Sequence, residues 1–188
     1  MAALDFPLPA GLPVPQDDGA CAHLVGMSMP PVRLEATSCP PVDLSRLGQG
    51  RSAIYAYPMT GVPGVLLPEG WDLIPGARGC TPQTCGFRDL HQELAGLGAR
   101  VYGLSTQDTG YQREMSTRLH VPFPVLSDAG FTLCDALRLP TFIVDGKRLV
   151  KRLTLIVHDG VIEHVFYPVF PPDRNAADVA CWLRANPA

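Results

Sequence analysis

Short apolar runs bounded by glycine, proline and aspartate recur along the chain, and each predicts a buried strand or one face of a helix. The strongest strand pattern spans 52–57, where β-branched and aromatic residues lie between Gly50 and Pro58. Weaker patterns predict strands at 32–35, 99–104 and 124–126, with a brief connection at 42–46. The pairs Asp145-Gly146 and Asp159-Gly160 predict two hairpins, because Asp-Gly is a favoured turn pair. Their strands are expected at 141–144 with 149 onward, and at 151–157 with 161–169.

Helical spacing appears in four other segments. A helix is expected to begin near Cys80, with Leu90, Leu94 and Leu97 on one face and a stop at Gly98. Asp108 can cap a helix that continues to residue 119, and a short helix is expected around 131–137. Asn175 can cap a last helix over 176–184.

The order of these elements, β-α-β-α-β-α-β-β-α, predicts an α/β fold with a central mixed β-sheet and helices on both faces. A chain of 188 residues fits one such domain, which we place at 31–188. Residues 1–30 are rich in proline and glycine without sustained periodicity, and they predict an irregular N-terminal arm lying on the domain.

Composition narrows the class of protein. Hydrophobic residues make up 46% of the chain, enough for a normal core, while 18% charged residues and a net charge of −3 predict no nucleic-acid partner. No apolar run approaches the roughly 20 residues of a membrane span, and the N-terminus lacks the pattern of a signal peptide. Six cysteines are few for a secreted disulfide framework of this length, so we expect a reducing compartment, the cytoplasm.

The segment 79–89, GCTPQTCGFRD, carries the most specific chemistry. Cys80 and Cys85 lie at a predicted loop-to-helix junction, where unsatisfied N–H groups and the helix dipole favour a thiolate. A second thiol nearby can react with the product that the first thiol forms. The alternative is a pair of buried structural cysteines, but the arrangement favours thiol redox chemistry.

This segment resembles the active-site motif of the thioredoxin-fold peroxiredoxins of the AhpC/TSA superfamily, most closely the bacterioferritin-comigratory-protein (Q-type) branch. The flanking segments SAIYAYP, VYGLSTQD, FPVLSD and KRLTLIVHDGVIEHVF are similar to the family's strands in the same order, so the resemblance covers about 31–166. It implies a thioredoxin-like fold and a thiol peroxidase. The substrate would be hydrogen peroxide or an organic hydroperoxide, and the reductant a thioredoxin-type protein.

The resemblance also implies roles for individual residues. Cys80 becomes the peroxidatic cysteine, which attacks the hydroperoxide and is oxidised to a sulfenic acid. The family's arginine falls at Arg152, in the predicted strand 151–157, where its planar fork can serve both thiolate and peroxide. Four other cations remain candidates for this role: Arg78, Arg88, Arg138 and Lys151.

The sequence departs from the family pattern before Cys80. The family has a proline seven positions and a hydroxyl three positions before its peroxidatic cysteine, but here these positions hold Leu73 and Ala77. We interpret residues 61–78 as an insertion that folds back over the site, so that Pro58 and Thr60 keep the family's substrate-binding roles. Three residues of the insertion can line a substrate pocket or pack against the core: Leu66, Leu67 and Trp71.

Cys85 is the expected resolving cysteine, forming a Cys80–Cys85 disulfide. Five residues apart on a helix, the two Cα atoms are roughly 8–9 Å apart, whereas a disulfide seldom spans more than about 7 Å. The first turn must therefore unwind, and Pro82 eases this because a proline there removes no helical hydrogen bond. Cys21 or Cys39 could resolve instead.

The remaining cysteines and the histidines suggest no further chemistry. Cys134 and Cys181 are expected in the core, and His91 on a helix surface. The histidines lack metal-ligand spacing and CxxxxC is no zinc pattern, so we expect no metal, haem or nucleotide.

Two other functions stay open. A thiol–disulfide oxidoreductase shares the fold but uses Cys-x-x-Cys, and a non-catalytic redox sensor would oxidise once and signal to a partner. We expect a monomer or homodimer.

Overall fold

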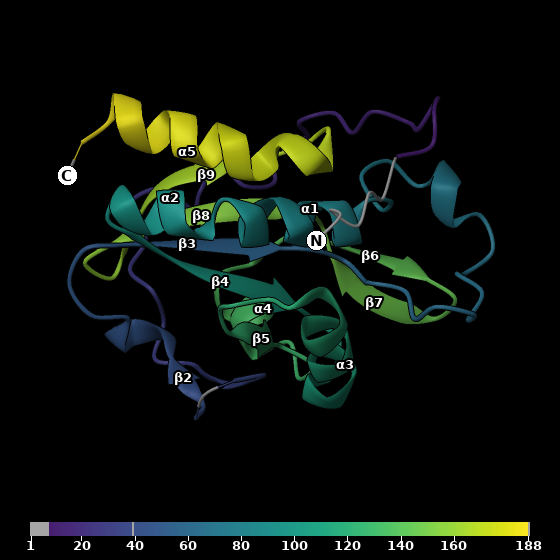
Figure 1. The fold of residues 1–188 in the computed structure, drawn as a ribbon, viewed down its shortest axis with the longest axis horizontal. Coiled ribbons are helices and arrows are strands. Elements are labelled where there is room, and N and C mark those ends of the chain that lie inside the picture. Colours follow the sequence, from purple (N-terminus) through teal and green to yellow (C-terminus); the bar gives the residue numbers. More distant parts are fainter. Residues whose placement is uncertain (1–7, 39, 188) are drawn as a thin grey trace.

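The computed structural model describes residues 8–38 and 40–187, which form one seven-stranded mixed sheet and a separate two-stranded sheet (Figure 1). The large sheet has the order β2-β1-β5-β4-β3-β8-β9, and β6 pairs with β7 outside it. The strands are β1 (Arg33–Ala36), β2 (Val42–Asp43), β3 (Arg51–Ala56), β4 (Ala99–Ser105), β5 (Val125–Ser127), β6 (Thr141–Val144), β7 (Lys147–Val150), β8 (Leu153–His158) and β9 (Val161–Phe166). The helices are α1 (Cys80–Asp89), α2 (His91–Gly96), α3 (Thr109–Leu119), α4 (Thr132–Ala136) and α5 (Asn175–Ala185), with 3₁₀ turns η1 (Leu44–Arg46), η2 (Trp71–Leu73) and η3 (Pro172–Arg174).

The centre of the sheet is buried on both sides. β3 runs parallel to β4 and β4 parallel to β5, while β8 lies antiparallel on the other side of β3. All six residues of β3 are buried, because helices and loops cover both faces of a sheet at its parallel centre. This explains why the chain shows continuous apolar runs rather than strict alternation.

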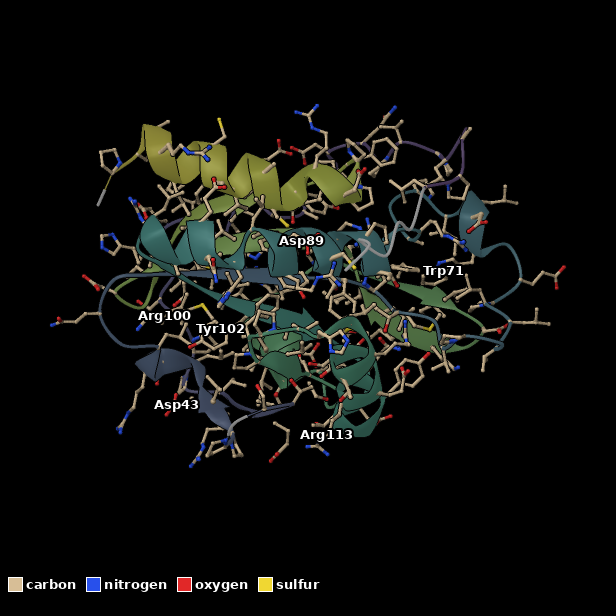
Figure 2. The ribbon with its side chains drawn as sticks, in the orientation of Figure 1. Asp43, Trp71, Asp89, Arg100, Tyr102 and Arg113 are labelled. Atoms are coloured by element: carbon tan, nitrogen blue, oxygen red, sulfur yellow. The ribbon has the colours of Figure 1, made fainter. Side chains whose placement is uncertain are left out.

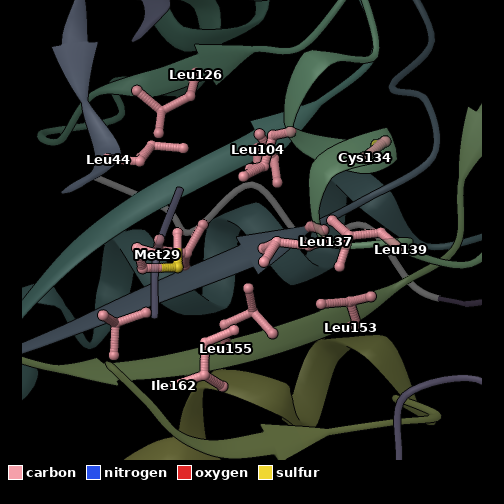
Figure 3. Close-up of a cluster of buried hydrophobic side chains, with 14 of the residues drawn as sticks. Met29, Leu44, Leu104, Leu126, Cys134, Leu137, Leu139, Leu153, Leu155 and Ile162 are labelled. Carbon is pink, nitrogen blue, oxygen red and sulfur yellow. The ribbon is translucent and has the colours of Figure 1, made fainter. Parts of the chain in front are cut away.

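Two hydrophobic clusters lie on opposite faces of this sheet. On one face, α1, α2, α3 and α5 pack around Tyr55 and Phe87, whose rings stack with centroids 4.2 Å apart. On the other face, α4, η1 and the N-terminal segment pack around Ile54, Leu104 and Leu155, and Figure 3 shows the last two with their neighbours in this cluster. The predicted mixed sheet with helices on both faces is therefore confirmed.

Residues 8–30 contain no helix or strand and lie against the domain through backbone hydrogen bonds. The amide of Met29 donates to the Gly160 carbonyl at 2.7 Å, and that of Gly26 donates to Ile162 at 2.8 Å. Leu24 is fully buried in the second cluster. The boundary at residue 30 stays a prediction. Of the helices in 8–38 and 40–187, none has the length and apolar character that a membrane crossing requires.

Three differences from the predictions bear on the site, beside shifts of one to three residues at other strand and helix ends. The helix expected from Cys80 to Gly98 is two helices, interrupted at Leu90. β8 begins at Leu153, so Arg152 precedes the strand instead of lying in it. Asn175 is the first residue of α5 and makes no capping bond, because its side-chain oxygen accepts hydrogen bonds from elsewhere in the core. The predicted cap at Asp108 is confirmed, since its Oδ1 accepts from the Tyr111 amide at 2.8 Å.

Candidate active site

Cys80 is the first residue of α1, at the edge of the sheet where the central parallel strands end. The residue before it, Gly79, has a φ of 103°, a left-handed conformation that favours glycine. A Cβ at this position would also collide with the ring of Pro172 in η3. Gly79 therefore lets the chain turn into the helix while η3 packs closely over the turn.

The Arg152 guanidinium contacts the Cys80 sulfur directly. Its Nη2 lies 3.2 Å from Cys80 Sγ, and the arginine side chain is only 3% exposed. The guanidinium also donates to the main chain of the segment before Cys80: Nε to the Gly76 carbonyl at 3.2 Å, and Nη2 to the Ala77 and Arg78 carbonyls at 3.0 and 3.1 Å. Within residues 8–38 and 40–187, no carboxylate forms an ion pair with Arg152. A buried cation requires a compensating anion, and the Cys80 thiolate can supply it.

A buried polar chain behind Arg152 was missed by the sequence reasoning. Gln83 Oε1 accepts a hydrogen bond from Arg152 Nη1, and Gln83 Nε2 donates to Asn175 Oδ1 at 2.9 Å. Thr154 Oγ1 also donates to Asn175 Oδ1, at 2.7 Å. Gln83 follows Cys80 by three residues and lies on the same side of the helix. This spacing could have predicted that Gln83 lies near the Cys80 site. Asn175 and Thr154 gave none, because they meet Gln83 only in the folded structure.

Cys80 opens into a cavity of about 460 Å³. Its walls come from residues 59–65, Leu67 and Trp71 on one side and residues 78–82 on the other, with Leu8 and Arg118 at the margins. Thr60 lies in this wall, and its hydroxyl and amide both donate to Gln107 Oε1, at 3.2 and 3.0 Å. A hydroxyl that donates in this way keeps its lone pairs free to accept. The structure thus brings Thr60 to the cavity that Cys80 lines.

Pro58 lies behind this wall. It is buried, and its carbonyl accepts a hydrogen bond from Ser105 Oγ at 3.1 Å. It does not line the cavity itself, so its expected contact with substrate stays a prediction.

The segment 61–78 folds against the β6–β7 hairpin and forms one wall of the cavity. Trp71 is 3% exposed and packs with Leu149, Ala77 and Phe142, whose ring centroid lies 6.2 Å from that of the indole (Figure 2). Trp71 therefore fills both of the alternative roles considered for it: it lines the cavity and packs against the protein. Leu66 does neither, since it is 95% exposed.

Cys85 is buried on α1, and its burial raises the pKa of its thiol. Both Cys80 and Cys85 are free thiols on an intact helix. Their five-residue separation places the Cα atoms roughly 8–9 Å apart, which exceeds the reach of a disulfide. In this structure the two thiols are therefore too far apart to form a disulfide.

The other thiols lie elsewhere. Cys134 is fully buried, as expected, and burial raises the pKa of Cys21 to about 12. The prediction that Cys181 belongs to the core is wrong: it is exposed, because α5 turns positions 176, 179, 180 and 183 inward. Cys39 lies outside the described residues.

Three of the four competing cations pair with carboxylates in the structure. Arg78 pairs with Asp72 at 3.1 Å, Arg88 with Asp89 at 2.8 Å and Lys151 with Asp18 at 2.8 Å. Arg138 shows no bond to Cys80. His91 is half-buried at the start of α2, with its ring centroid 5.5 Å from that of Phe123. In the described part of the chain, no cluster of histidine, cysteine and acidic side chains could hold a metal ion.

A sequence model of the family described as Redoxin matches residues 24–180. The chain belongs to the redoxin family. The predicted likeness to the bacterioferritin-comigratory (Q-type) peroxiredoxins is confirmed by curated relatives of this redoxin. Over 162 residues it is 26% identical to a putative peroxiredoxin bcp of Coxiella burnetii, covering 82% of this chain and 95% of the relative. Peroxiredoxin Q of Oryza sativa subsp. japonica, a chloroplastic protein, is 24% identical over 183 residues, covering 95% and 77%.

Solved structures confirm the thioredoxin-like peroxiredoxin fold of this redoxin. Peroxidoxin BcpB of Mycobacterium tuberculosis superposes with a TM-score of 0.71 at 27% identity, covering 88% of this chain and 100% of that one. Peroxiredoxin Q of Xanthomonas campestris superposes with a TM-score of 0.67 at 19% identity, covering 93% and 98%, which shows the fold alone.

Proposed function

We propose that this redoxin is a thiol peroxidase that reduces hydroperoxides through Cys80. The observation that carries the proposal is the buried Arg152 guanidinium, 3.2 Å from Cys80 Sγ beside an open cavity. A structural cysteine needs neither a desolvated cation nor access to a cavity, whereas a peroxidatic thiolate needs both.

The first step is a two-electron oxidation of Cys80. The thiolate attacks the terminal oxygen of the hydroperoxide, an S–O bond forms and the O–O bond breaks. The leaving alkoxide or hydroxide takes up a proton and departs as alcohol or water, while Cys80 becomes a sulfenic acid. Arg152 is placed to stabilise the thiolate beforehand and the negative charge on the leaving oxygen afterwards. Thr60 can accept a hydrogen bond from the substrate O–H.

The second step regenerates the enzyme through Cys85. Its thiol condenses with the sulfenic acid to give a Cys80–Cys85 disulfide and water, once the first turn of α1 has unwound. A thioredoxin-type dithiol then reduces this disulfide. Because six cysteines are few for a secreted disulfide framework of this length, the proposal includes a cytoplasmic location, with the protein acting as a monomer or homodimer.

Recycled turnover distinguishes this function from its two alternatives. The test follows hydroperoxide consumption with thioredoxin, its reductase and a nicotinamide reductant, using Cys80→Ser as the variant and Cys181→Ser, an exposed thiol, as the matched control. We expect Cys80→Ser to lose turnover and Cys181→Ser to keep it. A sensor would consume one equivalent and stop, and a disulfide oxidoreductase would reduce a model disulfide without consuming hydroperoxide. A Cys80→Ser protein with most of its activity would contradict the proposal.

A further inference from the structure

The cavity at Cys80 is larger than hydrogen peroxide requires. Its volume of about 460 Å³ falls within the range of about 300–1,000 Å³ found for sites that hold small organic ligands. A molecule the size of two waters would occupy a small part of it. The remaining space is therefore available to an organic group attached to the peroxide.

Apolar side chains of the segment 61–78 form one part of the wall of this extra space. Leu67 and Trp71 both face the cavity, together with Val62, Pro63 and Val65. Trp71 is held from behind by Leu149 and Ala77, so its position is fixed before a ligand arrives. Leu67 folds back over Gly61, where a Cβ would come within 3.2 Å of Leu67 Cδ2. The segment therefore packs against itself at Gly61 and Leu67 on the side that lines the cavity.

The charges at the margin favour an uncharged ligand. Arg78 and Arg118 both line the cavity, but Arg78 pairs with Asp72 at 3.1 Å and Arg118 with Glu114 at 2.7 Å. Arg118 also donates to the Gly61 carbonyl at 3.3 Å. Neither guanidinium is left to compensate a carboxylate on the ligand. Among the residues that the structure describes, the cation in contact with the Cys80 sulfur is Arg152, which serves the peroxide end.

We propose that Leu67 and Trp71 form a subsite for the apolar group of an uncharged organic hydroperoxide, and that they determine the substrate preference of this enzyme. The inference rests on the proposed peroxidase function and adds the residues that select the organic group of the substrate. The peroxide group lies at Cys80 and Arg152, while an aryl or branched alkyl group contacts the indole and the leucine. Hydrogen peroxide reacts at the same sulfur without using this subsite.

The kinetic test compares two neighbouring leucines on the same loop. Leu67→Ala removes a cavity-lining side chain, whereas Leu66→Ala removes one that is 95% exposed. Removing apolar contacts of this size changes discrimination by about 10-fold or more. We expect Leu67→Ala to lower kcat/KM for cumene hydroperoxide about 10-fold and to change kcat/KM for hydrogen peroxide less than 2-fold. Leu66→Ala should match the wild type with both. Equal losses with both peroxides in Leu67→Ala would overturn the subsite.

A binding measurement tests the subsite without turnover. The double variant Cys80→Ser with Trp182→Phe has Trp71 as its remaining tryptophan. Cumyl alcohol, the product of cumene hydroperoxide reduction, is added in increasing amounts while the fluorescence of Trp71 is measured. We expect saturable quenching that weakens about 10-fold when Leu67→Ala is added, and that is unchanged when Leu66→Ala is added. Absence of saturable quenching would overturn the subsite. Quenching in a protein whose wild type consumes no hydroperoxide would instead refute the peroxidase function and leave the apolar site standing. Tighter binding of a fatty-acid carboxylate than of cumyl alcohol would contradict the uncharged ligand.

Discussion

Replacing Asn175 by alanine should speed the formation of the Cys80–Cys85 disulfide. Asn175 Oδ1 accepts hydrogen bonds from Gln83 Nε2 at 2.9 Å and Thr154 Oγ1 at 2.7 Å, and all three residues are buried. Gln83 lies in the turn of α1 that must unwind before the two thiols can meet. The Asn175 side chain therefore stabilises the wound helix against the unwound one.

The size of the effect follows from the group left unpaired. In Asn175→Ala the Gln83 amide remains buried without an acceptor as long as the turn is wound, which costs about 1–3 kcal/mol. Unwinding exposes this amide to water and removes the cost. The local equilibrium should therefore shift toward the unwound form by roughly 5- to 150-fold. Thr154 lies in β8 and stays buried in both forms, so its lost partner does not change this ratio.

Rapid mixing with one equivalent of hydroperoxide, followed by acid quench and mass spectrometry, measures the decay of the sulfenic acid to the disulfide. We expect faster decay in Asn175→Ala, and less sulfinic acid at excess peroxide because the sulfenic acid persists for a shorter time. Thr154→Val also loses a bond to Asn175 but leaves the Gln83 bond in place, so it should decay like the wild type. An unchanged or slower decay in Asn175→Ala, or equal acceleration in Thr154→Val, would refute the reasoning.

Three further predictions concern the site and its thiols. Arg152→Lys should lower the second-order rate with peroxide nearly as much as Arg152→Ala, by at least about 10-fold, because lysine lacks the planar fork. Stopped-flow kinetics on folded protein checks this, and wild-type rates in Arg152→Ala would move the role to Arg78. Cys85→Ser should accumulate sulfinic acid at Cys80 under excess peroxide and lose thioredoxin-dependent turnover, and continued cycling would contradict Cys85 as the resolving thiol. Burial raises the pKa of Cys21 to about 12 and that of Cys85 above its ordinary value. Above about pH 9 the unfolded Cys21 thiol ionises while the folded one stays protonated, so stability should fall by up to about 1.4 kcal/mol per pH unit from Cys21, and the raised pKa of Cys85 acts in the same direction. Thermal melts of the reduced protein from pH 7.5 to 10 test this, and a Tm that stays constant over this range would contradict it.

The parts of the site that were predictable are those encoded locally. Cys80 and Cys85 lie in one short segment at a loop-to-helix junction, and Arg152 lies in a segment that resembles a family strand. The cap at Asp108 was readable for the same reason, because the capping bond spans three residues. Such signals depend on spacing along the chain and need no knowledge of the fold.

What was missed depends on contacts between distant segments. Asn175 reaches Gln83 across 92 residues and Thr154 across 21. Asn175 resembles a helix cap in the sequence, and only folding assigns its oxygen to other donors. Cys181 is a different case, since the inward positions 176, 179, 180 and 183 recur at helical spacing and place it on the outer face. That error came from reading the composition of the helix instead of its period.

The most direct test of the central claim is a map of the products after one equivalent of hydroperoxide. The account predicts a single intramolecular disulfide between Cys80 and Cys85, with one alcohol (or water, from hydrogen peroxide) released in the first step, one water in the second, and a small loss of helix content by circular dichroism. The loss of helix follows because the wound helix holds the two Cα atoms roughly 8–9 Å apart, beyond the reach of a disulfide. Full conversion to this disulfide would support Cys80 as the attacking thiol and Cys85 as its partner. A map in which Cys80 stays reduced, or is linked to Cys21, Cys39 or another chain, would contradict the account.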